Sequence, residues 1–197
     1  MIKIRDTFKS YKEYMDFYKN SKGYDLGIDK ITDNDRRGIP EYERWQFGLE
    51  FVQGDILDIG SWTGRWPVVL KANGFNVDCV EANKAAYEYL KKHTDLKCSN
   101  TMIEEFKTDK KYDTITCFEV IEHAYNMRKF IDKIVSLLKP HGLLILSTPS
   151  KDGCYKDEDN KIHLWTADIY SLAETLRDFQ IEEMDIGDLI LIKARLL

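Results

Sequence analysis

Hydrophobic residues in the middle of the chain alternate between short continuous runs and helical spacing. Ile56–Ile59 and Val77–Val80 are mainly apolar runs of strand length, and Trp66–Leu70 between them begins an apolar helical face. The same alternation continues toward the C-terminus. Further strands are predicted over residues 96–99, 114–118, 143–147, 181–185 and 189–194. Strands that alternate with helices predict an α/β fold with a mainly parallel sheet.

Two amphipathic helices are predicted ahead of this unit. The first covers Thr7–Asn20, where large apolar side chains recur at helical spacing with lysines between them. The second begins at Pro40, which a helix accepts in its first turn, and runs to about residue 52. Residues 21–39 are rich in Gly, Asp and Asn and are typical of a surface connection.

The last third of the chain contains helix and hairpin signals. A helix that follows residue 126 is expected to stop near Pro140, which cannot continue it. Thr166 is expected to cap a helix that runs to about Asp178, and the last two strands form a hairpin around Gly187. The acidic stretch 152–161 is expected to lie over the strand ends, where it either gates a substrate or is simply solvated.

Composition bounds the class of protein. A chain of 197 residues, 43% of them hydrophobic, is most simply one domain, here divided into a helical lid segment over 1–52 and a core over 53–197. The net charge of -5 disfavours a nucleic-acid partner held by phosphate contacts. The four cysteines form no C-x-x-C pair, no apolar run has membrane-spanning length, and the charged N-terminus lacks a signal-peptide core. We therefore expect a cytoplasmic protein with free thiols.

The stretch 56–81 has the organisation of a nucleotide-binding unit. About twenty residues separate Gly60 from Glu81, the interval between a glycine turn and a ribose-binding carboxylate. A dinucleotide loop of the form G-x-G-x-x-G would need a glycine at position 62, where this chain has Trp62. This difference favours a nucleoside cofactor without a phosphate. A dehydrogenase or flavodoxin-like βαβ unit stays open as the alternative on this stretch alone.

Two sequence motifs carry a resemblance to a known family. The stretch 58–64, DIGSWTG, resembles motif I of the class I S-adenosylmethionine-dependent methyltransferases, usually D-x-G-x-G-x-G, from which Trp62 departs. The stretch 112–149 contains YDTITCFEVIEH, LLKPHG and LILSTP, and is similar to the following region of that family, particularly the ubiquinone-biosynthesis O-methyltransferase-like group. Both stretches are in register, and the resemblance covers roughly residues 40–197.

The resemblance implies a fold and a set of cofactor contacts. The implied fold is a Rossmann-like seven-stranded sheet of order 3-2-1-4-5-7-6, with an antiparallel last strand and helices on both faces. Arg44, beside Tyr42 and Trp45 in the lid, is the candidate partner of the methionyl carboxylate, although a plain helix face with aromatic core anchors stays open. The implied cofactor-binding residues are Arg44, Asp58, Gly60, Ser61, Trp62, Gly64, Glu81, Ala82, Met102, Ile103 and Phe118.

Glu119, Glu122 and His123 are the candidate catalytic residues. They follow the fourth predicted strand at its carboxyl end, the edge where open α/β sheets bind ligands. His123 is the candidate general base. The alternative is structural, with Glu122 capping a turn and His123 packed under the next loop. The expected reaction is methyl transfer from S-adenosylmethionine to a small-molecule or sugar acceptor, at a hydroxyl oxygen.

A metal site is the alternative use of the same residues. The stretch EVIEH at 119–123 resembles the metal-binding segment of the ubiquinone O-methyltransferases and of the small-RNA 2'-O-methyltransferases. With His163, the alternative ligand set is Glu119, Glu122, His123 and His163, which suits manganese, iron or zinc better than magnesium. Our first interpretation of these residues includes no divalent metal. Metal-assisted 2'-O-methylation of RNA and a non-catalytic cofactor-binding regulatory protein remain the alternative functions.

Overall fold

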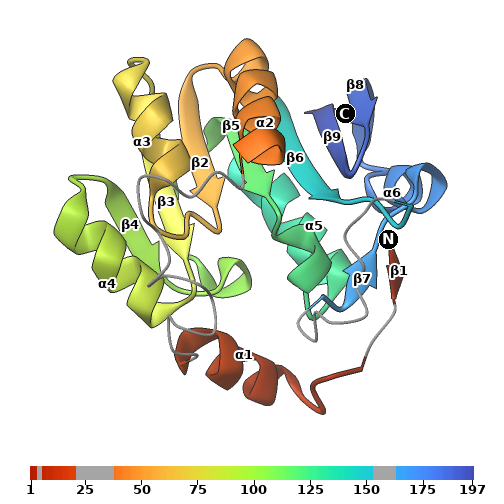
Figure 1. Ribbon diagram of the computed structural model, residues 1–197, viewed down its shortest axis with the longest axis horizontal. Helices are drawn as coiled ribbons and strands as arrows, with labels where there is room; N and C mark the ends of the chain where they lie inside the picture. Colours follow the sequence, from red (N-terminus) through yellow and green to blue (C-terminus); the bar gives the residue numbers. More distant parts are fainter. Residues whose placement is uncertain (4–5, 21–37, 153–162) are drawn as a thin grey trace.

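The computed structural model describes residues 1–3, 6–20, 38–152 and 163–197, and its centre is a seven-stranded sheet of order β4-β3-β2-β5-β6-β9-β8 (Figure 1). Its strands are β2 (Asp55–Ile59), β3 (Asn76–Glu81), β4 (Lys97–Asn100), β5 (Tyr112–Phe118), β6 (Leu138–Pro149), β8 (Phe179–Ile186) and β9 (Leu189–Leu196). Counted within this sheet alone, the order reads 3-2-1-4-5-7-6. Only β9 runs in the direction opposite to the other strands of the sheet. The predicted Rossmann-like α/β fold is confirmed.

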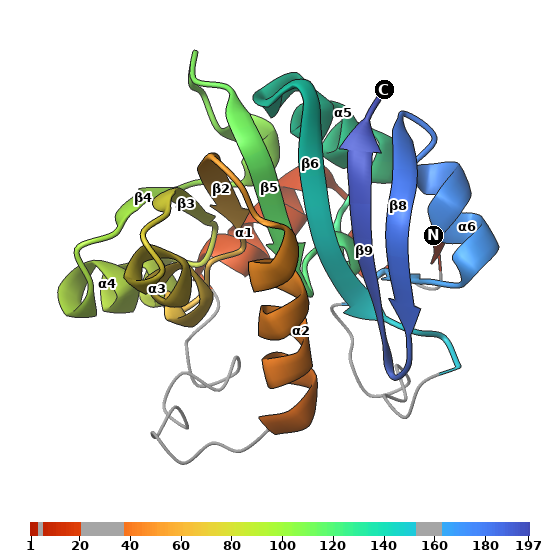
Figure 2. The same ribbon diagram turned by 90° about the horizontal axis from the view of Figure 1, so that it is seen from above.

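Helices cover both faces of this sheet (Figure 2). The α-helices are α1 (Tyr11–Asn20), α2 (Gly38–Phe51), α3 (Arg65–Ala72), α4 (Lys84–His93), α5 (Met127–Leu137) and α6 (Ile169–Thr175). Two short 3-10 helices, η3 (Ile103–Glu105) and η4 (Ile121–His123), follow β4 and β5. In the described part of the chain, none of the helices has the length and apolar content that crossing a membrane requires.

The core has two layers because successive residues of a strand face opposite sides of the sheet. Leu57 and Ile59 of β2 pack in the layer that contains α5 and α6, whereas Ile56 packs with Trp66 and Leu70 of α3. All three β2 side chains expose 2% or less of their surface. Burial of each stabilises the fold by about 1.5–3 kcal/mol. A strand buried on both faces explains why its apolar run shows no alternation.

The start of α6 differs from the prediction. Thr166 does not cap this helix, because Trp165–Thr166 forms β7 and pairs with β1 (Ile2–Lys3) in a separate two-stranded sheet. Asp168 is the cap instead: its Oδ1 accepts a hydrogen bond from the backbone N–H of Ser171 at 2.8 Å, and the Ser171 hydroxyl completes a capping box. An aspartate with a reciprocal partner three residues later satisfies two backbone donors, which fixes the cap two residues after Thr166 and the helix start at Ile169.

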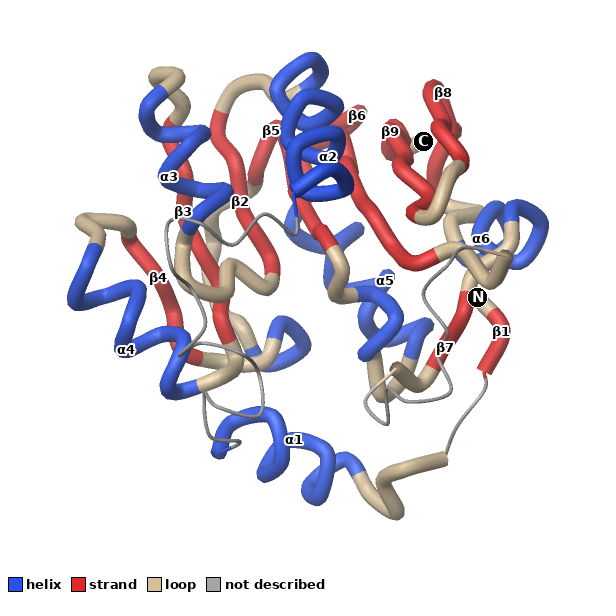
Figure 3. The backbone as a smooth tube through the Cα atoms, viewed as in Figure 1, coloured by secondary structure: helices blue, strands red, loops and turns tan. Residues whose placement is uncertain are grey.

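The first helix is shorter than predicted and lies across the carboxyl ends of the central strands (Figures 1 and 3). Its start is set by Ser10, whose Oγ accepts a hydrogen bond from the Glu13 backbone N–H at 3.2 Å, so that the helix begins at Tyr11 and not at Thr7. At its other end, the Asn83 side-chain amide donates to the carbonyl of Tyr18 at 3.0 Å. α1 therefore stands over the edge at which ligands bind in this fold.

Several predictions concern residues outside the described part. These are residues 153–161 of the acidic stretch 152–161 and residues 21–37 of the connection 21–39. Cys154 and the side chain of Tyr42 also lie outside the described part. Cys79, Cys98 and Cys117 are free thiols, as expected.

Candidate functional site

A cavity of about 360 Å³ opens where β2, β3 and β5 end, between the sheet and helices α1 and α2. It brings together residues that lie far apart in the sequence. The predicted cofactor and catalytic residues that line it are Arg44, Asp58, Gly60, Ser61, Trp62, Glu81, Ala82, Met102, Ile103, Phe118, Glu119 and His123. Gly64 instead precedes α3 with a φ of 85°, and the Glu122 side chain lies behind the cavity wall with 1% of its surface exposed.

The glycine loop passes close to the residues that follow β5. Gly60 has a φ of 73°, and a Cβ built on it would lie 2.3 Å from Cγ2 of Val120. Only glycine satisfies both this conformation and this approach. Trp62 has a φ of 48°, the left-handed region that the usual glycine of the motif favours. This conformation costs about 1–2 kcal/mol, and a hydrogen bond from the Trp62 N–H to a carboxylate oxygen of Glu81, at 2.7 Å, offsets it.

Two buried acids stand beside this loop. Glu81 accepts hydrogen bonds from the N–H groups of Trp62 and Asn83, both at 2.7 Å, yet burial raises its pKa to about 7. Asp58 accepts a hydrogen bond from the Thr116 hydroxyl at 2.7 Å, and burial raises its pKa to about 6. Because a carboxylate has about four acceptor sites, Glu81 retains capacity for hydroxyl donors of a ligand.

Three buried donors also line the cavity. Arg44 Nε, Thr63 Oγ1 and Trp66 Nε1 have no hydrogen-bond partner among the described residues, although all three residues line the cavity. Trp66 is held between Trp45 of α2, at 6.4 Å between ring centroids, and Phe118 of β5, at 5.3 Å. Unpaired buried donors are unfavourable, and a bound carboxylate would satisfy them.

Glu119 lies beside Arg44 in the cavity wall. Its φ is 56°, and its Oε1 accepts a hydrogen bond from the Ser147 hydroxyl at 2.7 Å. Arg44 Nη1 lies 3.7 Å from the same oxygen. Burial raises the pKa of Glu119, while the Arg44 charge opposes this shift. The two predicted residues are thus neighbours, and Glu119 joins α2 to the sheet.

Glu122, His123 and His163 form a second cluster, in which the candidate metal-ligating atoms lie within 4.8 Å of one another. The backbone N–H of Leu164 donates to the carbonyl of Glu122 at 2.9 Å, which ties the segment of His163 to η4. The Thr148 hydroxyl donates to Glu122 Oε2 at 3.2 Å. Glu122 therefore contacts β6, and it makes no side-chain cap of η4. Glu119 does not belong to the cluster.

Sequence reasoning missed part of the cavity wall. The rings of α1 belong to it, although their helical spacing indicated only packing. The missed lining residues include Tyr14, Tyr18, Thr63, Trp66, Thr101, Glu104 and Phe130. One signal was available: tyrosines, not leucines, occupy the apolar face of the first helix, and a tyrosine offers a polar group at a ligand-facing surface.

Comparisons with known proteins agree with this arrangement. The model of a methyltransferase domain family matches residues 33–181. A ubiquinone biosynthesis O-methyltransferase of Rickettsia typhi is 42% identical over 99 residues, which are 47% of this chain and 40% of the relative. The enzyme of the same name from Rickettsia akari is 35% identical over 126 residues, 61% of this chain and 45% of the relative. The chain thus spans less than half of the length of these relatives.

Solved structures show the same fold. The N-methyltransferase NodS of Bradyrhizobium japonicum, in complex with S-adenosyl-L-homocysteine, has a TM-score of 0.66 at 19% identity and covers 85% of this chain and 90% of its own. An S-adenosylmethionine-dependent methyltransferase of Clostridium acetobutylicum has a TM-score of 0.68 at 14% identity and covers 89% and 99%. Because the family model matches most of the chain, the protein belongs to the methyltransferase domain family, within the class I S-adenosylmethionine-dependent methyltransferases.

Proposed function

We propose that this chain binds S-adenosylmethionine and transfers its methyl group to a hydroxyl oxygen of a small-molecule or sugar acceptor. One observation carries the proposal: a single cavity contains the glycine loop and Glu81 at one side and the polar residues that follow β5, Glu119 and His123, at the other. A pure nucleoside binder has no need of an imidazole at that place.

The residues present fit the cofactor. Glu81 would accept the ribose hydroxyls, and the loop at Gly60 admits a ligand close to its backbone. Arg44, with the unpaired donors of Thr63 and Trp66, would bind the methionyl carboxylate. When bound, the cofactor supplies an electrophilic methyl group on a positively charged sulfur.

The chain's own groups would position and deprotonate the acceptor. His123 would take the hydroxyl proton as the acceptor oxygen forms its bond to the methyl carbon. Glu119 holds Arg44 and Ser147 in place and lines the same cavity. Helices α1 and α2 cover the site and would exclude water, which is why we also propose one methyltransferase domain over residues 1–197, with 1–52 as its lid segment.

The hydroxyl acceptor rests on the curated relatives. Those from Rickettsia typhi and Rickettsia akari are named O-methyltransferases, whereas the structural neighbour NodS is named an N-methyltransferase at only 19% identity. The curated relatives are more similar to this chain in sequence than NodS is, which favours oxygen as the methylated atom.

The test combines binding and turnover. Calorimetric titration with S-adenosylhomocysteine should show binding, and incubation with S-adenosylmethionine and 4-ethylcatechol, a neutral ring with paired hydroxyls, should yield a mono-O-methylated product by mass spectrometry. Absence of cofactor binding would refute the proposal. Binding without transfer to this acceptor or to a panel of sugars would refute the acceptor class and leave the cofactor assignment standing.

A second candidate function is metal-assisted methylation of paired hydroxyls. The observation that favours it is the cluster of Glu122, His123 and His163, which offers one carboxylate and two imidazoles to a single point. This ligand type suits manganese, iron or zinc. The ion would orient the two acceptor hydroxyls and lower the pKa of one, and the hydroxyl of Thr148 would hold the Glu122 carboxylate in place.

Metal dependence separates the two candidates. After treatment with EDTA, turnover of 4-ethylcatechol should fall and return with manganese if the cluster binds an ion. The variant H163A should then lose manganese binding in calorimetry while it keeps its affinity for S-adenosylhomocysteine. Turnover that is insensitive to EDTA and to H163A would leave His123 as a general base without a metal.

A further inference from the structure

Glu104 lines the cavity but has no part in the function proposed above. It belongs to η3, and both of its carboxylate oxygens are buried without a hydrogen bond from any described residue. Burial raises the pKa of Glu104, its own backbone N–H opposes this shift, and the charges of Glu105 and Lys129 respectively raise and lower the pKa. Lys129 forms no ion pair with Glu104 among the described contacts. A buried carboxylate without a counter-ion is unfavourable unless a ligand provides one.

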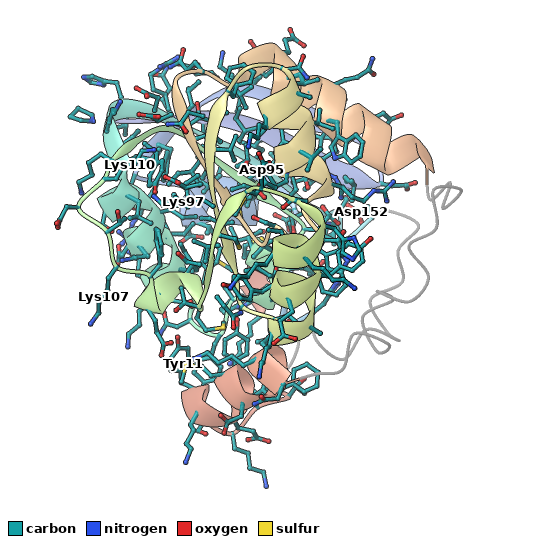
Figure 4. All side chains as sticks on the ribbon, turned by 90° about the vertical axis from the view of Figure 1, so that its left-hand side faces the viewer. Tyr11, Asp95, Lys97, Lys107, Lys110 and Asp152 are labelled. Atoms are coloured by element: carbon teal, nitrogen blue, oxygen red, sulfur yellow. The ribbon has the colours of Figure 1, made fainter. Side chains whose placement is uncertain are left out.

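Three tyrosine rings pack in one cluster with Met102, the residue that directly precedes η3. The Tyr11 and Tyr14 rings of α1 lie 5.9 Å apart, and the Tyr125 ring lies 5.7 and 5.5 Å from them. Tyr14 and Glu104 line the same cavity, and burial, followed by the charge of Glu104, raises the pKa of both Tyr11 and Tyr14. The buried Tyr11 hydroxyl also has no partner among the described residues. Tyr11 lies on the side of α1 that faces the rest of the molecule (Figure 4).

Neighbouring aromatic rings connect Tyr14 with the proposed base, His123. The Tyr14 and Tyr18 ring centroids are 4.8 Å apart, and those of Tyr18 and His123 are 5.8 Å apart. Tyr14, Tyr18, Glu104 and His123 all line the one cavity. A planar acceptor along this wall would therefore place one end at His123 and the other at Glu104.

We propose that Glu104, with the rings of Tyr11 and Tyr14, forms a binding subsite for a cationic amino group of the methyl acceptor. A carboxylate supplies the opposite charge and accepts N–H hydrogen bonds, and tyrosine faces attract a cation. This subsite rests on the proposed function, because it identifies the acceptor as a molecule with a hydroxyl at one end and an ammonium group at the other.

The test uses two probes that differ only in this charge. Dopamine and 4-ethylcatechol share the ring and the paired hydroxyls, and only dopamine carries an ammonium group. Their binding to the full chain saturated with S-adenosylhomocysteine is measured by calorimetry, so that no turnover is needed. The wild type should bind dopamine about tenfold more tightly or better. E104Q keeps the size of the side chain and removes its charge, and should bind the two probes equally.

The matched control is E105Q, at an exposed neighbour paired with Lys19, and it should keep the preference for dopamine. Equal binding of both probes by the wild type, no binding of dopamine, or a preference that survives in E104Q would overturn the subsite. A loss of S-adenosylhomocysteine affinity in E104Q with an unchanged preference would assign Glu104 to the cofactor and also overturn it. Thermal unfolding of each variant confirms that it is folded. Failure of methyl transfer affects only the proposed function.

Discussion

The two sides of the cavity are built in different ways. The proposed cofactor side comes mainly from one continuous stretch, from β2 to Asn83, to which α2 adds Arg44. Its key contacts involve backbone groups, because the N–H groups of Trp62 and Asn83 donate hydrogen bonds to Glu81. The acceptor side collects side chains from α1, η3, η4 and the segment of His163. A local backbone unit fixes the position of a ligand shared by a whole family, whereas side chains from separate segments change independently and determine what is methylated. Variants on one side should therefore leave the other side's ligand unaffected.

The largest effect is expected on the acceptor side, in H123A. Removal of the proposed base should lower kcat by about 10²- to 10⁴-fold, while the affinity for S-adenosylhomocysteine stays within twofold. H93A is the control, because His93 ends α4 and stacks on Tyr89 away from the cavity. Steady-state kinetics and calorimetry on the same preparations measure both quantities. Unchanged turnover would remove His123 from the mechanism, and a parallel loss of cofactor affinity would break the division into two sides.

The next effect belongs to the cofactor side, in E81A. The variant loses the proposed ribose contact and two hydrogen bonds that hold the loop. Charge-assisted hydrogen bonds contribute about 1.5–3 kcal/mol each, so calorimetry should show S-adenosylhomocysteine binding at least about 100-fold weaker. At saturating cofactor, kcat should fall far less than in H123A. E88A, at an exposed position of α4, is the control. Full affinity in E81A would mean that Glu81 serves only to hold the loop.

This division also explains which residues of the site could be predicted from the sequence. The glycine loop and Glu81 were predictable because a turn, a strand end and a fixed interval are local properties of the chain. Even the exception at Trp62 has a local cause, the hydrogen bond to Glu81 that stabilises its left-handed backbone.

The acceptor side was predictable only where a motif exists, as in residues 119–123. That Tyr14 of the first helix lines the same cavity as Glu104, and that the ring centroids of His163 and His123 lie 4.8 Å apart, depends on tertiary packing. No periodicity in the sequence encodes such distances. The cap of α6 was misplaced for a related reason, since Thr166 is drawn into a strand by a partner more than 160 residues away.

A smaller effect is expected in R44K, because Arg44 contacts Glu119 and is also the proposed partner of the cofactor carboxylate. Lysine keeps the charge but loses the planar fork that suits a carboxylate, and its contact with Glu119 changes as well. S-adenosylhomocysteine should bind about tenfold more weakly, a loss of about 1.4 kcal/mol. R177K, on an exposed residue, should have no effect in the same titration. If decarboxylated S-adenosylhomocysteine shows the same tenfold loss in R44K, Arg44 does not bind the carboxylate.

The smallest effect is a pH dependence with opposite signs for stability and for binding. Burial raises the pKa of Glu81 from 4.5 to about 7, so the folded protein binds more protons than the unfolded chain between these values. Stability without ligand should therefore fall as pH rises from 4.5 to 7, by on the order of 2 kcal/mol from this group. Asp58, with a pKa of about 6, adds a shift of the same sign at lower pH.

Cofactor affinity should run the other way, because ribose hydroxyls donate to the ionised form of Glu81. The affinity for S-adenosylhomocysteine should reach its maximum above about pH 8 and weaken by about tenfold between pH 8 and pH 6. E81Q carries no titrating group there, so the wild type minus E81Q difference isolates Glu81 from other ionisations in both thermal unfolding and calorimetry. If the ligand binds without contact to Glu81, the wild-type and E81Q affinity curves will be parallel, while the stability difference between them persists. Only a direct contact between the ligand and Glu81 makes cofactor affinity rise with pH while stability falls.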